Sequence, residues 1–204
     1  TNQALSMTRR RIILFDVMET LVTEPFFTAV PQFFGMTLDE LLVAKHPTSW
    51  IDFEEGRITE SEYFNRFFHG GRSVDGDKLK RCMRQAYGWI DGMEELLADT
   101  RSAGYEIHAF SNYSIWYQMI DEALNLSRYL SWTFVSCATG VRKPDPRAYL
   151  GVEKALGVTP TECLFIDDRT ENVEAAIRIG MNVILKVDSA QVRKELATKR
   201  IFEN

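Results

Sequence analysis

Cysteine is scarce in this chain of 204 residues: Cys82, Cys137 and Cys163 are widely spaced and form no CxxC pair. Three scattered cysteines predict neither a disulfide framework nor a zinc site, and they fit a reducing compartment. Long apolar runs are also missing, since none approaches the ~20 residues that a membrane-spanning helix needs. Residues 1–8 lack the apolar core of a signal peptide. We therefore expect a protein that is neither secreted nor embedded in a membrane.

Basic stretches are short, and the formal net charge is −5. Because nucleic-acid binding requires a concentrated cationic surface, we expect no nucleic-acid partner. A GxGxxG turn and a GxxxxGKS or GxxxxGKT loop are both absent, which argues against the usual dinucleotide and nucleoside triphosphate sites. The chain begins with Thr rather than Met. An upstream segment such as an organelle leader could have been removed, so both the cytoplasm and an organelle stay open as locations.

The hydrophobic fraction of 45% and the charged fraction of 26% are ordinary for a folded globular protein. Short apolar runs predict five buried strands, at 11–15, 106–110, 132–136, 163–166 and 183–187. Helical periodicity lies between them, at 93–103, 115–124, 146–156 and 172–179. Strands that alternate with helices predict an α/β fold with a Rossmann-like core. Its parallel five-stranded sheet should bind ligands at the carboxyl ends of the strands.

The long interval between the first two predicted strands has helix signals but no convincing strand. Capping boxes begin at Thr37 and Thr59, so two helices are expected to start there. A further signal is an apolar helix face with i, i+3 and i+4 spacing, formed by Phe64, Phe67 and Phe68. We predict an α/β core over 1–22 and 91–204. An inserted α-helical cap domain over 23–90 should cover the carboxyl edge of the sheet.

Polar side chains stand at four of the predicted strand ends. The set comprises Asp16, Ser111, Asn112, Lys143, Asp167 and Asp168. Each signal is weak alone, because a strand-end Asp or Ser equally suits a turn or helix cap, and a Lys beside prolines is usual in a surface loop. The adjacent carboxylates Asp167 and Asp168 would repel each other without a cation, which favours a hard metal such as Mg²⁺. Parallel strands bring all four ends into one crevice, so the combination is specific.

In this order, the four motifs resemble those of the haloacid dehalogenase superfamily, and the resemblance covers nearly the whole chain. It implies that Asp16 is a nucleophile that becomes an aspartyl-phosphate. Thr20, in the turn that follows, would position it. Ser111 and Lys143 would hold the transferring phosphoryl group, and Asn112 would support the substrate.

The same resemblance implies a Mg²⁺ site. Its ligands would be Asp16, the backbone carbonyl of Met18 and Asp168. Asp167 would reach the metal directly or through water, and Asn172 would lie one shell further out. Such an ion would neutralise the repulsion between an anionic nucleophile and an anionic substrate.

Met18 departs from the family pattern, because phosphatases of the superfamily usually carry a second Asp there as general acid. That assistance is typically worth roughly 10²–10⁴ in rate. Glu19 is the candidate substitute, and the alternatives are that Glu19 is a solvated or salt-bridged turn residue or that water or a substrate group does the work. The missing Asp also fits a 2-haloacid dehalogenase, whereas the Asp167 and Asp168 pair favours a phosphatase. A protein that binds a ligand without turnover is the remaining alternative.

Aromatic residues are frequent within 23–90, and most should fill the interior of a helical bundle. Trp50 and Phe53 are our candidates for contact with the substrate. The segments 15–20 and 33–54 resemble the plant and algal flavin mononucleotide hydrolases of the superfamily. That resemblance implies a small phosphorylated metabolite, FMN, as the partner, which would be converted to riboflavin and phosphate, and it makes the plastid one fitting organelle. A sugar phosphate or a nucleoside monophosphate is the alternative substrate, and the oligomeric state stays open.

Overall fold

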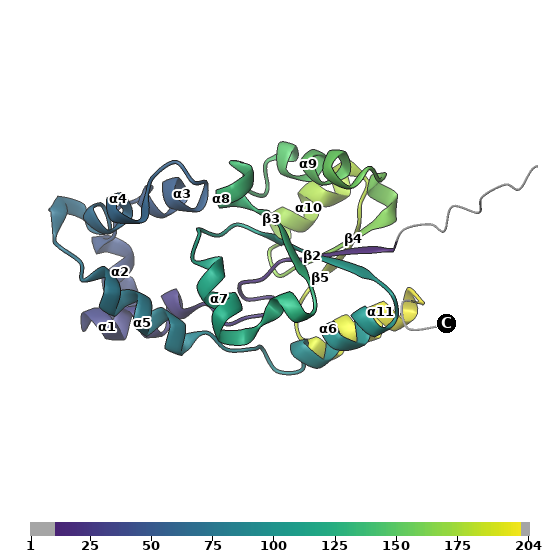
Figure 1. Cartoon of the computed structure of the whole chain (residues 1–204), viewed down its shortest axis with the longest axis horizontal. Helices are drawn as coiled ribbons and strands as arrows, with labels where there is room; N and C mark the ends of the chain where they lie inside the picture. The colour runs from purple at the N-terminus through teal and green to yellow at the C-terminus, as the bar shows by residue number, and fades with distance from the viewer. Residues whose placement is uncertain (1–10, 201–204) are drawn as a thin grey trace, which may run out of the picture.

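The computed structural model describes residues 11–200, so the outer ends of the predicted core domain, 1–10 and 201–204, lie outside the described residues. Within that range the strands form one parallel sheet in the order β3-β2-β1-β4-β5. They are β1 (Ile12–Phe15), β2 (Glu106–Ser111), β3 (Ser131–Val135), β4 (Cys163–Asp167) and β5 (Asn182–Leu185). Helices lie on both faces of this sheet (Figure 1). The predicted Rossmann-like core with a parallel five-stranded sheet is confirmed, and β1 is its central strand.

The helices of the core begin and end close to the predicted positions. They are α6 (Met93–Ser102), α7 (Tyr117–Leu124), α9 (Pro146–Leu156) and α10 (Thr170–Ile179). The sequence pattern did not predict the helices α8 (Ser136–Thr139) and α11 (Ser189–Thr198), nor the 3₁₀ turns η3 (Leu126–Arg128) and η4 (Pro160–Glu162). Left-handed glycines end α9 at Gly157 and α10 at Gly180, as expected for a residue without a Cβ.

Two predicted strands end earlier than expected. β3 ends at Val135 because Ser136 begins α8. β5 ends at Leu185, which is paired with Asp167 at the end of β4. Val187 therefore has no neighbouring strand residue to pair with, and its side chain is 71% exposed.

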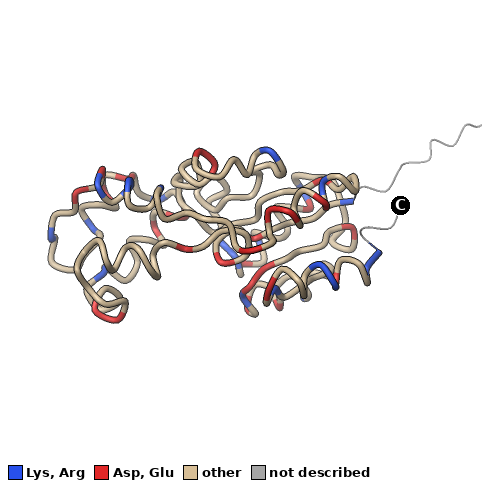
Figure 2. The backbone as a smooth tube through the Cα atoms, turned by 90° about the horizontal axis from the view of Figure 1, so that it is seen from below, with Lys and Arg blue, Asp and Glu red and all other residues tan. Residues whose placement is uncertain are grey.

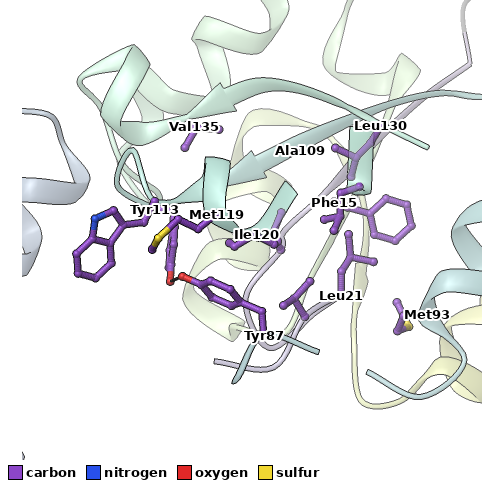
Figure 3. Packing of buried hydrophobic residues seen from close by; sticks show 14 of the residues in the cluster. Phe15, Leu21, Tyr87, Met93, Ala109, Tyr113, Met119, Ile120, Leu130 and Val135 are labelled. Carbon is purple, nitrogen blue, oxygen red and sulfur yellow. Dashed lines mark hydrogen bonds between the residues drawn. The ribbon is translucent and has the colours of Figure 1, made fainter. Parts of the chain in front are cut away.

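Both faces of β1 are buried. Ile12 and Leu14 pack in a cluster with residues of α9 and α10, whereas Ile13 and Phe15 pack in a cluster with residues of α6 and α11. Because successive side chains of a strand point to opposite faces, a strand covered on both sides needs an unbroken apolar run. Figure 3 shows the second cluster at close range, with Phe15, Leu21, Ala109 and Ile120 among its labelled residues. The first polar side chain after β1 is Asp16, which stands at the centre of the carboxyl edge of the sheet.

The segment from 23 to 90 contains helices but no strand, only isolated bridges. Its helices are η1 (Pro25–Phe27), α1 (Ala29–Phe34), α2 (Leu38–Ala44), α3 (Ser49–Glu54), α4 (Glu60–Asn65), η2 (His69–Gly71) and α5 (Gly76–Ala86). They gather to one side of the sheet (Figure 1). Both predicted capping boxes are present, since the hydroxyl groups of Thr37 and Thr59 accept the N–H of the glutamate three residues on.

The prediction that Phe64, Phe67 and Phe68 form one face of a helix is wrong. α4 ends at Asn65, and Phe67 and Phe68 follow it in non-helical backbone. There the chain turns to pair with the end of α2, because the N–H of His46 donates to the carbonyl of Phe67 at 2.8 Å and Lys45 forms a bridge with Phe68. Both phenylalanines are nevertheless buried, so tertiary packing and not helical spacing places them in the core.

Charged positions of both signs are interspersed along the backbone (Figure 2). Among the described residues, no helix combines the length and the apolar character that a membrane crossing requires. That there is no nucleic-acid partner stays a prediction.

Candidate active site

Asp16 is fixed by the backbone on both sides. Its N–H donates to the carbonyl of Ile166 at 2.9 Å, which continues the pairing of β1 with β4. The chain then closes a tight turn in which the N–H groups of Leu21 and Val22 both donate to the carbonyl of Val17, at 2.8 and 2.9 Å. Asp16 is only 7% exposed, so a short turn presents one nearly buried carboxyl group at the sheet edge.

Lys143 connects the motifs of three strands. Its Nζ donates to Asp16 Oδ1 at 2.8 Å, to Asp167 Oδ2 at 2.7 Å and to the Phe110 carbonyl at 2.5 Å. Asn112 holds the backbone of Lys143 from both sides, because its Oδ1 accepts the Lys143 N–H at 2.7 Å and its Nδ2 donates to the Lys143 carbonyl at 2.8 Å. Ammonium, carboxylates and amide therefore form one network with little freedom to move.

The two aspartates at the end of β4 have different surroundings. Asp167 is fully buried, and both of its oxygens accept protein donors: Oδ1 the N–H of Arg169, and Oδ2 both Lys143 Nζ and Asn172 Nδ2. Asp168 is only partly buried and faces the Thr20 hydroxyl, whose oxygen lies 3.3 Å from Asp168 Oδ1 and 3.0 Å from Asp16 Oδ2. The Thr20 hydroxyl has one proton, so it can donate to only one of these oxygens at a time.

The cluster is short of positive charge. Burial raises the pKa of Asp16 to about 7 against the opposing charge of Lys143, and Asp167 and Asp168 add to the increase. Burial and the charge of Asp167 also raise the pKa of Asp168. Burial disfavours the charged form of Lys143, but Asp16 and Asp167 outweigh it and raise the pKa of its ammonium group. One lysine does not neutralise three clustered carboxylates, and a further cation would.

The donor set fits Mg²⁺. Asp16, Asp167 and Asp168 each offer an oxygen, and these atoms lie within 4.8 Å of one another. Mg²⁺ prefers carboxylate oxygens and keeps several waters. Asp16 and Asp168 have fewer protein donors on their oxygens than Asp167 has, which favours them as direct ligands and Asp167 as a ligand through water. Met18, the expected carbonyl ligand, lines the same cavity.

A cavity of about 600 Å³ opens above this cluster. Its floor contains Asp16, Met18, Asn112, Lys143 and Asp168. Its aromatic walls are Phe26, Phe27, Trp50, Tyr63, Phe67, Tyr113 and Trp116. Its remaining charged or titratable walls are Glu19, Glu24, Lys45, His46, Glu54, Arg142 and Arg169. Within residues 11–200, the cavity thus joins the carboxyl edge of the sheet to the helical segment.

Some of the predicted site residues line the cavity and others do not. Trp50 lines it, as expected. Phe53 does not: it is 3% exposed and stacks on Tyr63 with ring centroids 4.7 Å apart, which argues against its predicted contact with substrate. Thr20, which is fully buried, and Ser111, which ends β2 and is 3% exposed, lie behind the cavity wall.

Glu19 lines the cavity but is engaged in its own turn. Its Oε1 accepts the N–H of Glu24 at 2.6 Å, and its carbonyl accepts Lys186 Nζ at 2.8 Å. These contacts favour a turn role for Glu19 over that of the acid, with hydrogen bonds in place of the expected solvation or salt bridge. Sequence reasoning did not single out Glu24, Arg142 or Tyr113, whose only signal was their nearness to a motif or to the start of the insertion.

Comparisons with known proteins agree with the motifs. The family model of the haloacid dehalogenase-like hydrolases matches residues 11–180. Flavin mononucleotide hydrolase 1 of Arabidopsis thaliana, a chloroplastic protein, is 52% identical over 186 residues, which cover 91% of this chain and 76% of the relative. A phosphatase of Mycobacterium tuberculosis is 30% identical over 161 residues, with coverage of 78% and 70%.

A solved structure shares the fold. It is a HAD family enzyme of Bacteroides thetaiotaomicron in complex with magnesium and inorganic phosphate. Its TM-score is 0.72 at 19% identity, and the match covers 88% of this chain and 95% of that one. With its motifs gathered on one sheet edge and a family match over most of its length, the chain belongs to the haloacid dehalogenase-like hydrolases.

Proposed function

We propose that the chain is a Mg²⁺-dependent phosphatase that converts FMN to riboflavin and phosphate through an aspartyl-phosphate on Asp16. The observation that carries this proposal is the cavity itself, in which the Asp16 and Lys143 pair meets a wall of aromatic side chains. The 52% identity to a flavin mononucleotide hydrolase supports the choice of substrate. The paired carboxylates of Asp167 and Asp168 support a phosphatase over a dehalogenase, since halide displacement needs no cation.

The floor residues have separate tasks in this proposal. Asp16 attacks the phosphorus, the bond to the ribityl oxygen breaks, and water then hydrolyses the aspartyl-phosphate. Lys143 orients the nucleophile and contacts the phosphoryl oxygens, while Asn112 fixes the Lys143 backbone. Thr20 orients the second oxygen of Asp16.

Asp16, Asp168 and the Met18 carbonyl would hold the metal, with Asp167 acting through water. A bound Mg²⁺ supplies positive charge against the phosphoryl group and the nucleophile. The raised pKa values of Asp16 and Asp168 support this assignment, because a cation would return both groups to their anionic forms at neutral pH.

The walls select the substrate. A volume of about 600 Å³ suits a ligand larger than a simple phosphate ester. Trp50, which lines the cavity and is only partly buried, presents aromatic surface on which the planar flavin ring can stack. We propose that 23–90 acts as the cap domain and that the plastid is the compartment, in keeping with the chloroplastic relative.

A substrate panel tests this proposal. Phosphate release is measured from FMN, pyridoxal phosphate, sugar phosphates and nucleoside monophosphates, with Mg²⁺ and with excess chelator. We expect release from FMN to have a kcat/KM at least about tenfold above the others, and to stop with chelator. Release of phosphate from the other esters but not from FMN would support the phosphatase assignment and reject FMN as the substrate. Phosphate release that is unaffected by chelator would reject the proposed requirement for Mg²⁺.

A further inference from the structure

The cavity lacks the usual general acid but holds other carboxyl groups. Met18 occupies the position of that acid and its side chain cannot transfer a proton. Apart from the metal cluster, three glutamates line the cavity among the described residues: Glu19, Glu24 and Glu54. The question is which of them can hand a proton to a leaving oxygen next to Asp16.

Two of the three are committed elsewhere. Glu54 is 3% exposed and forms an ion pair with Arg142, whose Nε lies 2.7 Å from Glu54 Oε1. Burial raises the pKa of Glu54 and the charge of Arg142 opposes that increase, but the ion pair occupies the carboxyl group. Glu19 Oε1 accepts the N–H of Glu24 at 2.6 Å, and this short contact holds the carboxyl group in its own turn.

Glu24 differs from both. Within residues 11–200 its carboxyl group has no ion pair, and its Oε1 accepts the N–H of Phe26 at 3.0 Å as the cap of η1. Burial raises the pKa of Glu24 to about 7 against that hydrogen bond, and the charges of Glu19, Glu54 and Asp16 add to the increase. A carboxyl group in this state exchanges its proton near neutral pH, as a general acid must.

The position of Glu24 is also fixed by the core. It directly follows the turn that begins at Asp16, where the chain leaves the sheet for the helical segment. The N–H of Thr23 donates to the carbonyl of Gly88 at 2.9 Å, and Val22 forms a bridge with Trp89. The segment that leaves the sheet and the segment that returns to it therefore lie side by side. Glu24 is therefore held at the mouth of the nucleophile turn.

We propose that Glu24 is the general acid and base of this enzyme, in the role that Met18 cannot fill. The inference rests on the proposed phosphatase function. In the first step Asp16 forms a bond to phosphorus, the P–O bond of the ester breaks, and the Glu24 carboxyl gives its proton to the leaving alkoxide. In the second step the water oxygen attacks phosphorus, and the Glu24 carboxylate takes a proton from that water. The bond to Asp16 then breaks and phosphate leaves.

The test compares two leaving groups in the Glu24→Gln variant. Glutamine keeps an oxygen to accept the Phe26 N–H and loses only the proton to transfer. FMN has an alkyl leaving group that needs protonation, whereas p-nitrophenyl phosphate has one that does not. We expect kcat/KM to fall about 100-fold for FMN and less than about threefold for p-nitrophenyl phosphate.

A burst measurement isolates the second step. Since water activation is also lost, the Glu24→Gln variant should accumulate aspartyl-phosphate and release a burst of p-nitrophenol equal to the enzyme concentration. Glu19→Gln is the rival variant and should keep the wild-type ratio between the two substrates. An equal loss on both substrates in Glu24→Gln, or the selective loss appearing in Glu19→Gln, would overturn the assignment.

A measurement on the wild-type protein keeps the inference testable if the variant does not fold, and a double variant tests it further if the variant folds. In wild type, kcat/KM across aryl and alkyl phosphates should depend little on the leaving-group pKa, and a steep fall would show that no acid operates. The double variant Met18→Asp with Glu24→Gln should regain FMN hydrolysis at least about tenfold over Glu24→Gln alone. A wild-type protein inactive on every ester would reject the phosphatase itself, whereas an active one with an unchanged ratio in Glu24→Gln would reject only Glu24.

Discussion

The floor and the walls of the cavity are built by different forces. The floor, which includes Asp16, Lys143 and Asp168, is part of a charged network at the carboxyl ends of parallel strands. Hydrogen bonds of 2.8 and 2.7 Å join Lys143 to Asp16 and to the buried Asp167. The walls come largely from the helical segment and are held by aromatic packing such as that of Trp50 on Tyr63, with ring centroids 5.5 Å apart. Directional bonds on a rigid sheet fix the positions of reacting groups, whereas apolar packing sets only shape and volume. We infer that the floor determines the reaction and the walls determine the substrate.

The largest expected effect tests the floor alone. Asp16→Asn should lower phosphate release at least about 10³-fold on every ester, because an amide cannot form the aspartyl-phosphate. Thermal unfolding should show an intact fold, since the amide oxygen still accepts a hydrogen bond from Lys143 and the amide NH2 group can donate to the Thr20 hydroxyl oxygen. Asp39→Asn, at an exposed aspartate of α2, is the matched control and should keep wild-type turnover. Near-normal turnover in Asp16→Asn would reject covalent catalysis.

The same contrast explains what the sequence could predict. The floor was predictable because its residues follow apolar strands in a fixed order, and a parallel sheet brings such ends together whatever the loops do. The capping boxes at Thr37 and Thr59 were predictable because their hydrogen bonds join residues three positions apart. In both cases the signal is local or topological.

The walls were less predictable because their residues depend on contacts between distant segments. Phe67 and Phe68 leave the helical pattern to pair with the end of α2. Trp50 and Phe53 lie on one short helix, yet Trp50 faces the cavity and Phe53 faces the core. Glu24 lies in no motif, and only the folded arrangement around it reveals its raised pKa.

A pair of aromatic variants sharpens the assignment of the walls. Trp50→Ala should raise KM for FMN about tenfold, because lost ring stacking costs on the order of 1 kcal/mol or more. Hydrolysis of glycerol phosphate, which has no ring, should change little. Phe53→Ala should instead lower the free energy of unfolding by about 3–5 kcal/mol, as expected for a buried aromatic, with the KM for FMN kept. Equal effects of Trp50→Ala on both esters would remove Trp50 from the substrate site.

The smallest expected effect concerns Glu24, which lies where the floor meets the walls. Its pKa is raised from 4.5 to about 7 by burial and by the charges of Glu19, Glu54 and Asp16. The folded protein therefore binds this proton more tightly than the unfolded chain does. The resulting stability is fully present below pH 4.5 and is lost as the pH rises through about 7.

Thermal unfolding of the metal-free protein measures this loss between pH 5 and pH 8. Each pH unit in the window is worth at most about 1.4 kcal/mol, so the wild-type Tm should fall on the order of 5 °C further than the Tm of Glu24→Gln. Glutamine does not titrate, and the other cavity groups, including Lys45, His46 and Arg142, are common to both proteins, so the difference isolates Glu24. The exposed Glu174→Gln is the matched control and should follow wild type. Parallel pH curves for wild type and Glu24→Gln would mean that Glu24 is ionised in the folded protein, and the walls would then contribute shape alone.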